Sequence, residues 1–508
     1  MEEMHFPIQN QPEKEPVSLP TGKRELIFAA CILLSSLFLI NCAMFYGFHM
    51  GFAIAACLSV LFSSGYLISK GAKLSPYSIT VLILSLVIAG SFARSDDAPV
   101  KFIMFCFLLV SVNLGLCLLA GKNRRNPAAA ASLLDAGHTF FSLGFGRMPQ
   151  AYRGIRNAFK RSGTVGQKSG AVILGLCIAV PILLIIVPLL MFADAAFEGL
   201  LDKLPDFDTG ELIATVIFGV FFAFLFYTRG AALRHGAVTP AVQQKKKGLS
   251  PLTVNTVLVS VCIVYCVYLV SQLAYFSGGF SGILPEEYTM AEYARRGFFE
   301  MAWLCAINLC VMVGSLGLCV KEKAAPLSTR FLCLFIGIVT LFLVATASAK
   351  MMMYISSYGL TRLRVLTQVV MVFFAIVTVL VSVWLFVPKL PYMKAIVISA
   401  MLIGAAVSWT DVDSQVAKYN VDAYLSGKLD TVDVSHLSYL SYSAVPQLER
   451  LANEAQDPLV VEMAEDVLAR KAEYFYAAED FRQWNYAKDK AAEILLPLSP
   501  VAEDSQLH

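Results

Sequence analysis

Long apolar runs alternate with short polar segments along the chain from residue 26 to residue 409. A membrane-spanning helix needs about 20 mostly apolar residues. On that rule the pattern predicts eleven spans, of which the third, sixth and last are the shortest: 26–46, 50–69, 77–93, 100–120, 171–193, 212–227, 254–275, 297–320, 331–349, 365–387 and 395–409. We therefore expect an all-α, polytopic transmembrane helix bundle, followed by a small C-terminal helical domain outside the membrane.

Lysine and arginine are distributed unevenly between the loops on the two sides of this bundle. If the N-terminus lies inside, the internal segments carry 24 of these residues and the external loops carry 7, leaving aside Lys101 and the C-terminal tail. Basic loops remain in the cytoplasm in multi-span proteins. We therefore predict that the N-terminus lies inside and the C-terminus outside. With ten or twelve spans the tail would instead lie inside.

The internal segment 121–170 is the most basic part of the chain. Met148, Tyr152, Ile155 and Phe159 recur at helical spacing, and the basic residues lie mostly elsewhere on the same helix: Arg147, Arg153, Arg156, Lys160 and Arg161. This pattern is typical of a helix that lies on the inner leaflet and is attracted to anionic lipids. A docking site for a cytoplasmic partner is the alternative.

The tail after the last predicted span is acidic, with 18 acidic and 8 basic residues in 411–508. Pro446 and Pro458 occupy positions where helices can begin, and residues 459–478 have apolar positions at helical spacing. We predict a small domain of about three helices here. The expected organisation is then a cytoplasmic segment (1–25), four spans (26–120), a basic cytoplasmic segment (121–170), seven spans (171–410) and an external domain (411–508).

Composition narrows the possible classes of protein. Hydrophobic residues make up 57% of the chain, charged residues 15%, and the mean hydropathy is +0.66. A water-soluble protein has about a quarter of its residues charged, so soluble and disordered classes are excluded. The basic residues lie in loops between apolar spans, which does not fit a nucleic-acid-binding protein.

Motifs for cofactor and metal chemistry are missing from the sequence. All twelve cysteines lie in apolar spans, from Cys31 to Cys333, so neither a disulfide framework nor a zinc site is expected. There is no Walker loop, dinucleotide fingerprint, HExxH motif or nucleophile elbow. We expect no cofactor and no metal, and a function other than catalysis is favoured.

Charged and polar residues at the ends of spans are candidates for function, because burying them near lipid is costly. On the predicted topology they gather at the outer face, and the candidate ligand-binding residues are Asp194, Gln272, Arg296, Glu300, Tyr358, Arg362, Arg364 and Asp411. Gly359 predicts the end of one helix and Thr361 the cap of the next. The acidic pair Asp96-Asp97 lies in an external turn, where we expect it to be solvated.

Two interpretations of this outer cluster stay open. In the first, Arg296, Arg362 and Arg364 form ion pairs with the acidic residues Glu300, Asp194 and Asp411. These pairs hold helix ends together and have no binding or catalytic role. In the second, two arginines in the first turn of a helix, added to its dipole, form an anion site that faces outward. A phosphate or carboxylate of an envelope lipid or solute would bind there.

The same segments carry a resemblance to a known family. Ala193-Asp194, Gln272 with Tyr275, the run Glu292-Tyr-Ala-Arg-Arg-Gly-Phe-Phe-Glu300 and the run Tyr358-Gly-Leu-Thr-Arg-Leu-Arg364 resemble a bacterial family of multi-pass membrane proteins. That family is known as domain of unknown function 4173, and a close relative carries the number 4153. The resemblance covers roughly residues 170–490. It implies a bacterial cytoplasmic membrane and implies no activity.

Three functions are compatible with these observations. The leading hypothesis is an envelope protein that binds or senses something at its outer face, with an envelope ligand or signalling partner besides the lipid bilayer. A transporter of a small or anionic solute is the second, and it would use polar groups within the spans: Asn113, Asn308 and Thr340. A membrane transferase acting on a lipid-linked substrate is the third, with Glu300 or Asp194 as its base.

Overall fold

The computed structural model describes residues 18–20, 22–69, 71–72, 74–126, 130–161, 209–236, 248–279, 298–318, 326–478 and 480–499. These residues form seventeen α-helices and no β-strand, so the predicted all-α fold is confirmed. Ten of the helices are long and apolar enough to cross a membrane, and each coincides with a predicted span. The chain is therefore a multi-span membrane protein. The remaining predicted span, 171–193, lies outside the described residues.

The chain divides into two compact units that exchange short segments. Unit 1 comprises Met1–Arg94, Lys101–Ala241 and Ala478–Tyr486, and unit 2 comprises Ser95–Val100, Val242–Ala477 and Ala487–His508. A piece of the C-terminal tail thus belongs to the N-terminal unit, and the connection before the fourth span belongs to the C-terminal one.

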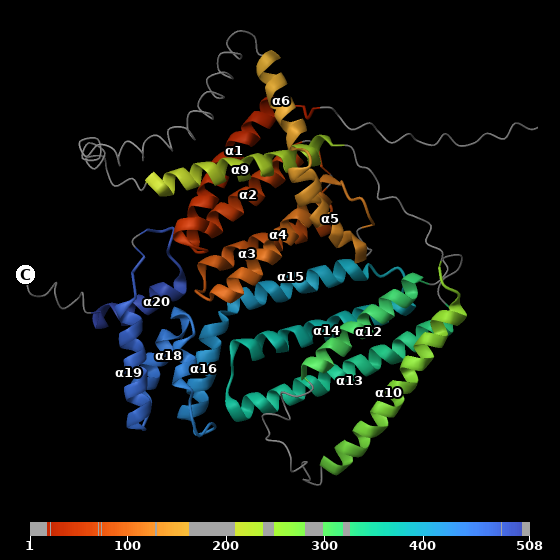
Figure 1. Ribbon diagram of the computed structural model, residues 1–508, viewed down its shortest axis with the longest axis vertical. Coiled ribbons are helices and arrows are strands. Elements are labelled where there is room, and N and C mark those ends of the chain that lie inside the picture. Colours follow the sequence, from red (N-terminus) through yellow and green to blue (C-terminus); the bar gives the residue numbers. More distant parts are fainter. Residues whose placement is uncertain are drawn as a thin grey trace, which may run out of the picture. The chain divides into compact units, whose positions relative to one another are not determined.

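Unit 1 is a bundle of long helices with a short helical segment after the fourth (Figure 1). Helix α1 packs against α2 and α9, and α2 also packs against α3. The helices are α1 (Lys23–Asn41), α2 (Met50–Ile68), α3 (Pro76–Gly90), α4 (Ala98–Ala120), α5 (Leu134–Gly137), α6 (Met148–Arg161) and α9 (Thr209–His235). The amphipathic helix predicted after Arg147 is confirmed as α6.

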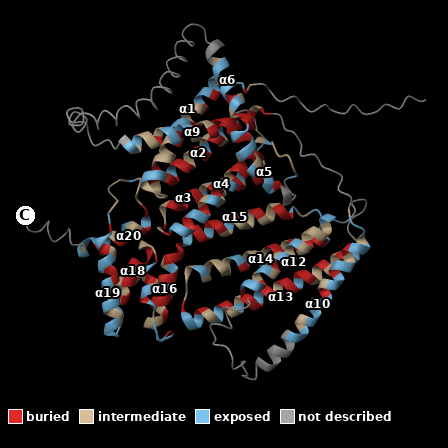
Figure 2. Ribbon diagram, in the orientation of Figure 1, coloured by how far each residue is buried: buried red, intermediate tan, exposed pale blue. Residues whose placement is uncertain are grey.

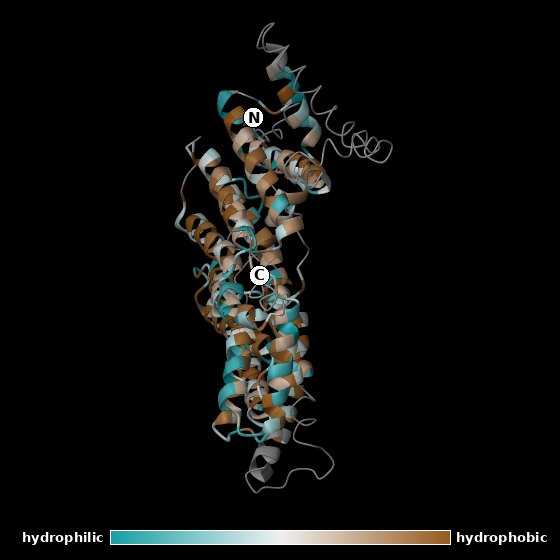
Figure 3. Cartoon of the chain, turned by 90° about the vertical axis from the view of Figure 1, so that its left-hand side faces the viewer, coloured by the Kyte–Doolittle hydropathy of each residue, from teal (hydrophilic) through white to brown (hydrophobic). Residues whose placement is uncertain are grey.

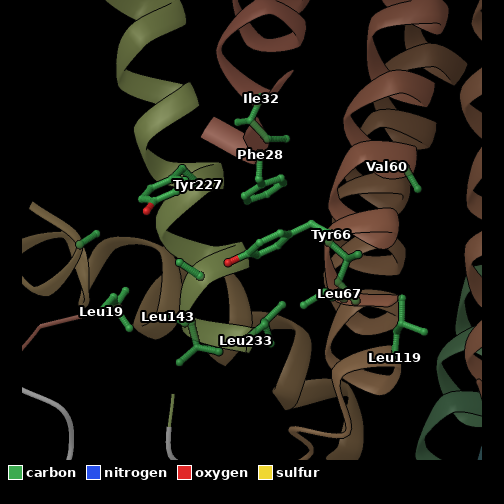
Figure 4. Close-up of a cluster of buried hydrophobic side chains, with 14 of the residues drawn as sticks. Leu19, Phe28, Ile32, Val60, Tyr66, Leu67, Leu119, Leu143, Tyr227 and Leu233 are labelled. Atoms are coloured by element: carbon green, nitrogen blue, oxygen red, sulfur yellow. The ribbon is translucent and has the colours of Figure 1, made fainter. Parts of the chain in front are cut away.

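A cluster of aromatic side chains holds α1, α2 and α9 together (Figure 4). The rings of Phe28 and Tyr66 are stacked with their centroids 4.1 Å apart, and Tyr227 lies 6.1 Å from Phe28. Phe28 is buried and faces Gly230 of α9, where a Cβ atom would come within 2.6 Å of the ring. The absence of a side chain at Gly230 therefore allows this close approach of α1 to α9.

Polar networks lie at the two opposite ends of α1. Around its first turn, which we call the Glu25 end, Glu25 Oε1 contacts His235 Nε2 at 3.0 Å, accepts a hydrogen bond from the Tyr66 hydroxyl at 3.2 Å, and lies 3.5 Å from Arg234 Nε. Arg234 also donates to the Tyr66 carbonyl and to Ser69 Oγ. Charges from α1 and α9 are thus paired where both helices begin or end.

The other end of α1, the Asn41 end, receives the tail segment Ala478–Tyr486. Arg482 donates to Asn41 Oδ1 at 2.6 Å, lies 3.8 Å from Glu211 Oε1, and stacks over the Tyr46 ring at 3.6 Å. The Trp484 carbonyl accepts a hydrogen bond from the Met50 N–H at 3.0 Å. Side-chain and backbone contacts therefore fix this piece of the tail at the end of α1 that is opposite Glu25.

Unit 2 contains five long helices followed by the helices of the tail. Helix α13 packs against α10, α12 and α14, and α15 packs against α14. These helices are α10 (Pro251–Gly279), α12 (Phe298–Leu318), α13 (Leu327–Tyr358), α14 (Arg362–Phe386) and α15 (Tyr392–Thr410). In the interior, Tyr265 donates to Asn308 and Asn308 donates to Thr340, so these buried polar groups satisfy one another.

The described residues of the tail form five α-helices, compared with about three predicted: α16 (Val412–Leu425), α17 (Val434–Ser438), α18 (Val445–Glu454), α19 (Pro458–Glu473) and α20 (Tyr486–Leu495). Pro446 and Pro458 lie in the first turns of α18 and α19, as predicted. The prediction missed α16 as a separate helix because it follows α15 directly, with only Asp411 between them.

Large apolar side chains are exposed on the long helices, and hydrophobic colour covers much of their surface (Figures 2 and 3). Val264 and Val267 of α10 are each 67% exposed, and Trp303 of α12 is 71% exposed. Contiguous apolar surface of this kind is not stable in water. These helix faces are therefore suited to lipid contact.

Helix α9 extends further than its predicted span. The span was expected to end at residue 227, but the apolar helix runs from Gly210 to His235. Arg229 and Arg234, expected in a cytoplasmic loop, therefore lie within the helix. Both are buried, so burial against other helices of unit 1 lets the helix continue past the polar residues that ended the predicted span.

The close contact at Gly230 predicts that Gly230→Ala destabilises unit 1. The added methyl group would lie 2.6 Å from the Phe28 ring, which stacking on Tyr66 holds in place. We expect a loss of about 1–3 kcal/mol from overpacking, measured by thermal unfolding in detergent. Gly65→Ala in α2 is the matched control, because a Cβ there meets nothing within 4 Å. Equal unfolding midpoints for the two variants would contradict this packing.

Candidate functional site

The turn between α13 and α14 is built from local sequence signals. Gly359 has φ +74° and ends α13, and the Thr361 side chain accepts a hydrogen bond from the Arg364 N–H. Both predictions for this turn are confirmed. Asn420 of α16 accepts from the Leu360 N–H at 2.6 Å and donates to the Leu360 carbonyl at 2.8 Å. The turn is thereby attached to the first helix of the tail, which lies beside it in Figure 1.

Arg362, the first residue of α14, contacts two carboxylates. Its Nε and Nη2 donate to Oδ1 and Oδ2 of Asp413 at 2.9 and 2.7 Å, and its Nε also lies 3.0 Å from Asp97 Oδ2. The side chains of Asp413 and Asp97 are 0% and 1% exposed, whereas that of Arg362 is 24% exposed. We call these three residues the Arg362 cluster.

Backbone groups complete the cluster. Asp413 Oδ2 accepts a hydrogen bond from the Ser441 N–H at 2.8 Å, and Asp97 Oδ1 accepts one from the Val100 N–H at 3.1 Å. The cluster therefore joins four segments that are distant in sequence: the α3–α4 connection, the start of α14, helix α16 and the residues after α17.

One guanidinium between two buried carboxylates leaves the cluster with an excess of negative charge. Burial, and then the charge of Asp413, raises the pKa of Asp97 to about 6. Burial acts to raise the pKa of Asp413 as well, but its hydrogen bonds from Arg362 and Ser441 outweigh this, and the pKa lies below its usual value. Asp413 therefore stays ionised while Asp97 takes up a proton in mildly acidic solution.

Arg364, the second arginine of the predicted anion site, is engaged in a different way. Its Nη1 donates to the Tyr358 carbonyl at 3.0 Å and to the Gly359 carbonyl. Its guanidinium also lies 4.1 Å from the centre of the Tyr354 ring. Arg364 thus caps the C-terminal end of α13, while the Tyr358 side chain is exposed.

The other predicted site residues are not all brought together. Asp411 adopts φ +56° between α15 and α16, where its side chain accepts a hydrogen bond from the Ser414 N–H. Arg362 pairs with Asp413. Glu300 is exposed in the first turn of α12. Asp194, Arg296 and the side chain of Gln272 lie outside the described residues.

The basic residues predicted to lie on the membrane surface are divided by burial. Arg153 and Arg156 are exposed on α6, but Arg147 is 6% exposed and buried in unit 1. Lipid contact by α6 therefore stays a prediction, and among the described residues it fits the exposed Arg153 and Arg156 better than the buried Arg147. The side chains of Lys160 and Arg161 lie outside the described residues.

Comparison with known protein families assigns the chain to one of them. Residues 28–451 match the family described as Domain of unknown function (DUF4153). The chain belongs to this family. The sequence resemblance put family 4173 first and 4153 only as its relative, and it began near residue 170, so both the number and the extent are corrected. No curated protein and no solved structure matches the chain.

Sequence reasoning on this DUF4153 protein missed two important side chains. Asp97 was expected to be solvated in a turn, but it is buried against Arg362. Its partner lies 265 positions away (362 − 97), and no local pattern marks such a pair. Arg229 was counted as a loop residue, but it is 4% exposed inside α9. The short run of small and apolar residues that follows Arg229, Gly230-Ala-Ala-Leu233, was a signal that could have revealed it.

The geometry of the cluster predicts that Arg362→Gln is strongly destabilising. Removing the guanidinium leaves two buried carboxylates side by side, and breaking a buried pair costs about 3–5 kcal/mol. Arg364→Gln is the matched control, because it loses hydrogen bonds to carbonyls that Gln can partly replace, which costs roughly 1–2 kcal/mol. Denaturant unfolding in detergent measures both. Similar losses for the two variants would contradict a special role of Arg362.

Proposed function

We propose that this membrane protein senses acidity at its outer face, and that the Arg362 cluster is the sensing element. The observation that carries the proposal is a pair of buried carboxyl groups, Asp97 and Asp413, held on one guanidinium at the junction of bundle and tail. An anion site fits the geometry less well, because Arg362 is neutralised by carboxylates and Arg364 donates to carbonyls.

Protonation of Asp97 changes the energy of this junction. With a proton on Asp97, the cluster holds one positive and one negative charge, which balance. Once Asp97 ionises, a second negative charge is buried 3.0 Å from a guanidinium that already forms two hydrogen bonds with Asp413. The added repulsion between the carboxylates weakens the contact, so a rise in pH loosens the attachment of the α3–α4 connection to α14.

Burial moves the pKa values of the neighbouring titratable groups in the opposite direction to that of Asp97. Burial lowers the pKa of His436 and that of Lys471 from their ordinary values. The charged and titratable neighbours of the cluster are Asp96, Arg362, Arg364, His436 and Lys471. Asp97 is the carboxyl group of the cluster whose pKa is raised into the mildly acidic range.

The contacts of the turn allow a change at the cluster to reach the membrane helices. Leu360 is paired with Asn420 of α16, and Arg362 begins α14, so the tail and the α13–α14 hairpin share one anchored junction. A change in the position of α16 therefore acts directly on two spans. Such a junction is suited to passing a signal from the external domain to the bundle.

The raised pKa of Asp97 predicts a pH-dependent stability. Its folded pKa of about 6 exceeds the ordinary 3.8, so the folded state binds the proton more tightly. The stabilisation is complete below about pH 4 and is lost as the pH rises through 6, by about 3 kcal/mol. Asp97→Asn, which carries no charge, removes this loss. Unfolding at pH 4 and pH 7.5, an interval that contains most of this loss, measures the difference between wild type and variant.

A structural readout accompanies that measurement. We expect hydrogen exchange of α16 and of the α13–α14 turn to increase with a midpoint near pH 6 in the wild type and to stay at its low-pH level in Asp97→Asn. Glu462→Gln is the matched control, because Glu462 is an exposed carboxylate of α19 and should leave the transition unchanged. A transition that persists in Asp97→Asn rules out the proposed sensor.

We further propose that the N-terminus lies inside and the tail outside a bacterial cytoplasmic membrane. Support comes from the loop charges and from unit 1, where Arg482 contacts Asn41 at one end of α1 while Glu25 contacts His235 at the other. Because α1 is long enough to span the bilayer, the tail segment and the start of α1 belong on opposite sides. The exposed Arg153 and Arg156 of α6 fit anionic lipids of the inner leaflet.

This topology predicts the activity of reporter fusions. A reporter that works only outside the cytoplasm should be active when fused after Leu507, and a reporter that works only inside should be active before Met1. The contact of Arg482 with Asn41 is the physical reason, since it holds the tail away from the Glu25 end. A cytoplasmic reporter that is active after Leu507 would overturn the proposed sidedness.

A further inference from the structure

Arg229 of α9 is a buried cation inside a membrane-spanning helix. It is 4% exposed and lies within the apolar stretch Gly210–His235. It is six residues from His235, which corresponds to about 9 Å along the helix axis. An arginine in this position is costly unless it is paired, and intramembrane ionisable residues usually mark binding or transport sites.

The partners of Arg229 do not neutralise its charge. Its Nη1 donates to Asn113 Oδ1 at 3.2 Å, and its guanidinium lies 4.9 Å from the centre of the Phe226 ring. Within the described part of the chain, no carboxylate pairs with it and its Nε has no hydrogen-bond partner. This contrasts with Arg234, one turn further along α9, which lies 3.5 Å from Glu25. Among the described residues, one positive charge and one buried donor are therefore unmatched.

The neighbouring residue on α9, Thr228, is a second buried polar group without a match. Thr228 is buried, and its hydroxyl also lacks a partner among the described residues. On α4, the helix that carries Asn113, Ser111 is by contrast satisfied, since it accepts a hydrogen bond from Ser85 of α3 at 3.0 Å and donates to the Leu108 carbonyl. In the described part of the chain, the unmatched polar groups therefore fall on two adjacent residues of α9.

We propose that Arg229 and Asn113 form an intramembrane binding site for a small monovalent anion, such as a halide or nitrate. A monoanion balances the single charge of Arg229, whereas a dianion would leave a buried negative charge. The Asn113 Nδ2 already donates to the Leu109 carbonyl, so the binding donors are those of the guanidinium. A lipid phosphate does not fit, because Arg229 is buried away from the bilayer. The site is separate from the Arg362 cluster and does not depend on its function.

The test compares the full chain with Arg229→Met, in nanodiscs of zwitterionic lipid, with sodium bromide or sodium gluconate at equal ionic strength. In bromide the wild type should show a saturable rise in unfolding midpoint of roughly a few degrees, and Arg229→Met should show none. In gluconate, Arg229→Met should be at least as stable as the wild type, because Met fills a similar volume without an unmatched charge. The wild type is therefore expected to be the more stable protein in bromide, and Arg229→Met to be at least equally stable in gluconate.

Controls locate the effect at Arg229. Arg153→Gln, an exposed arginine of α6 in the same unit, should respond to bromide like the wild type, and Arg229→Lys should respond with at least tenfold weaker affinity. Three results would overturn the proposal: no saturable bromide effect in the wild type, an equal effect in Arg229→Met, or an effect that requires anionic lipid. An Arg229→Met chain that fails to fold in gluconate would also overturn it, since the arginine would then be a satisfied structural group.

Discussion

The cost of burying a charge away from water governs the arrangement of this molecule. Three polar networks of the described residues lie where helices of the bundle begin or end, and each brings together side chains from several segments. Glu25 meets Arg234 and His235 at one end of α1, and Arg482 meets Asn41 at the other. Arg362 meets Asp97 and Asp413 where α14 begins. Because an unpaired partner would be far more costly than the pair, these contacts fix which helix ends belong together.

The Arg362 cluster contributes to the stability of unit 2 and is also the proposed acid-sensing element. Asp413 forms a fork with the guanidinium and keeps its charge, which anchors α16 to α14. Asp97 contributes a second carboxyl group whose protonation is favoured by burial and by Asp413. In the proposed function, a junction with one fixed and one variable charge holds the tail in place and responds to acidity. Membership in the DUF4153 family supplies the membrane fold but no activity, so the function proposed here depends on this geometry.

Sequence patterns predicted the features that depend on local chemistry. Ten spans, the stop at Gly359, the cap at Thr361 and the starts of α18 and α19 follow from apolar length, glycine, threonine and proline. Features that depend on tertiary contacts were missed. Asp97 and Arg362 lie far apart in sequence, and α9 continues past residue 227 because neighbouring helices bury Arg229 and Arg234. The backbone conformation of Asp411, which starts α16 directly after α15, also leaves no mark in the sequence.

The central claim, that Arg362 and Asp413 form an energetically coupled junction between bundle and tail, is tested most directly by a double-mutant cycle. The free energy of unfolding is measured for the wild type, Arg362→Gln, Asp413→Asn and the double variant in the same detergent. If the two side chains are coupled, the double variant loses less unfolding free energy than the two single variants lose together. The expected coupling energy is about 2–3 kcal/mol. Additive losses, within about 0.5 kcal/mol, would show that the two side chains act independently and would contradict the proposed coupling of Arg362 and Asp413.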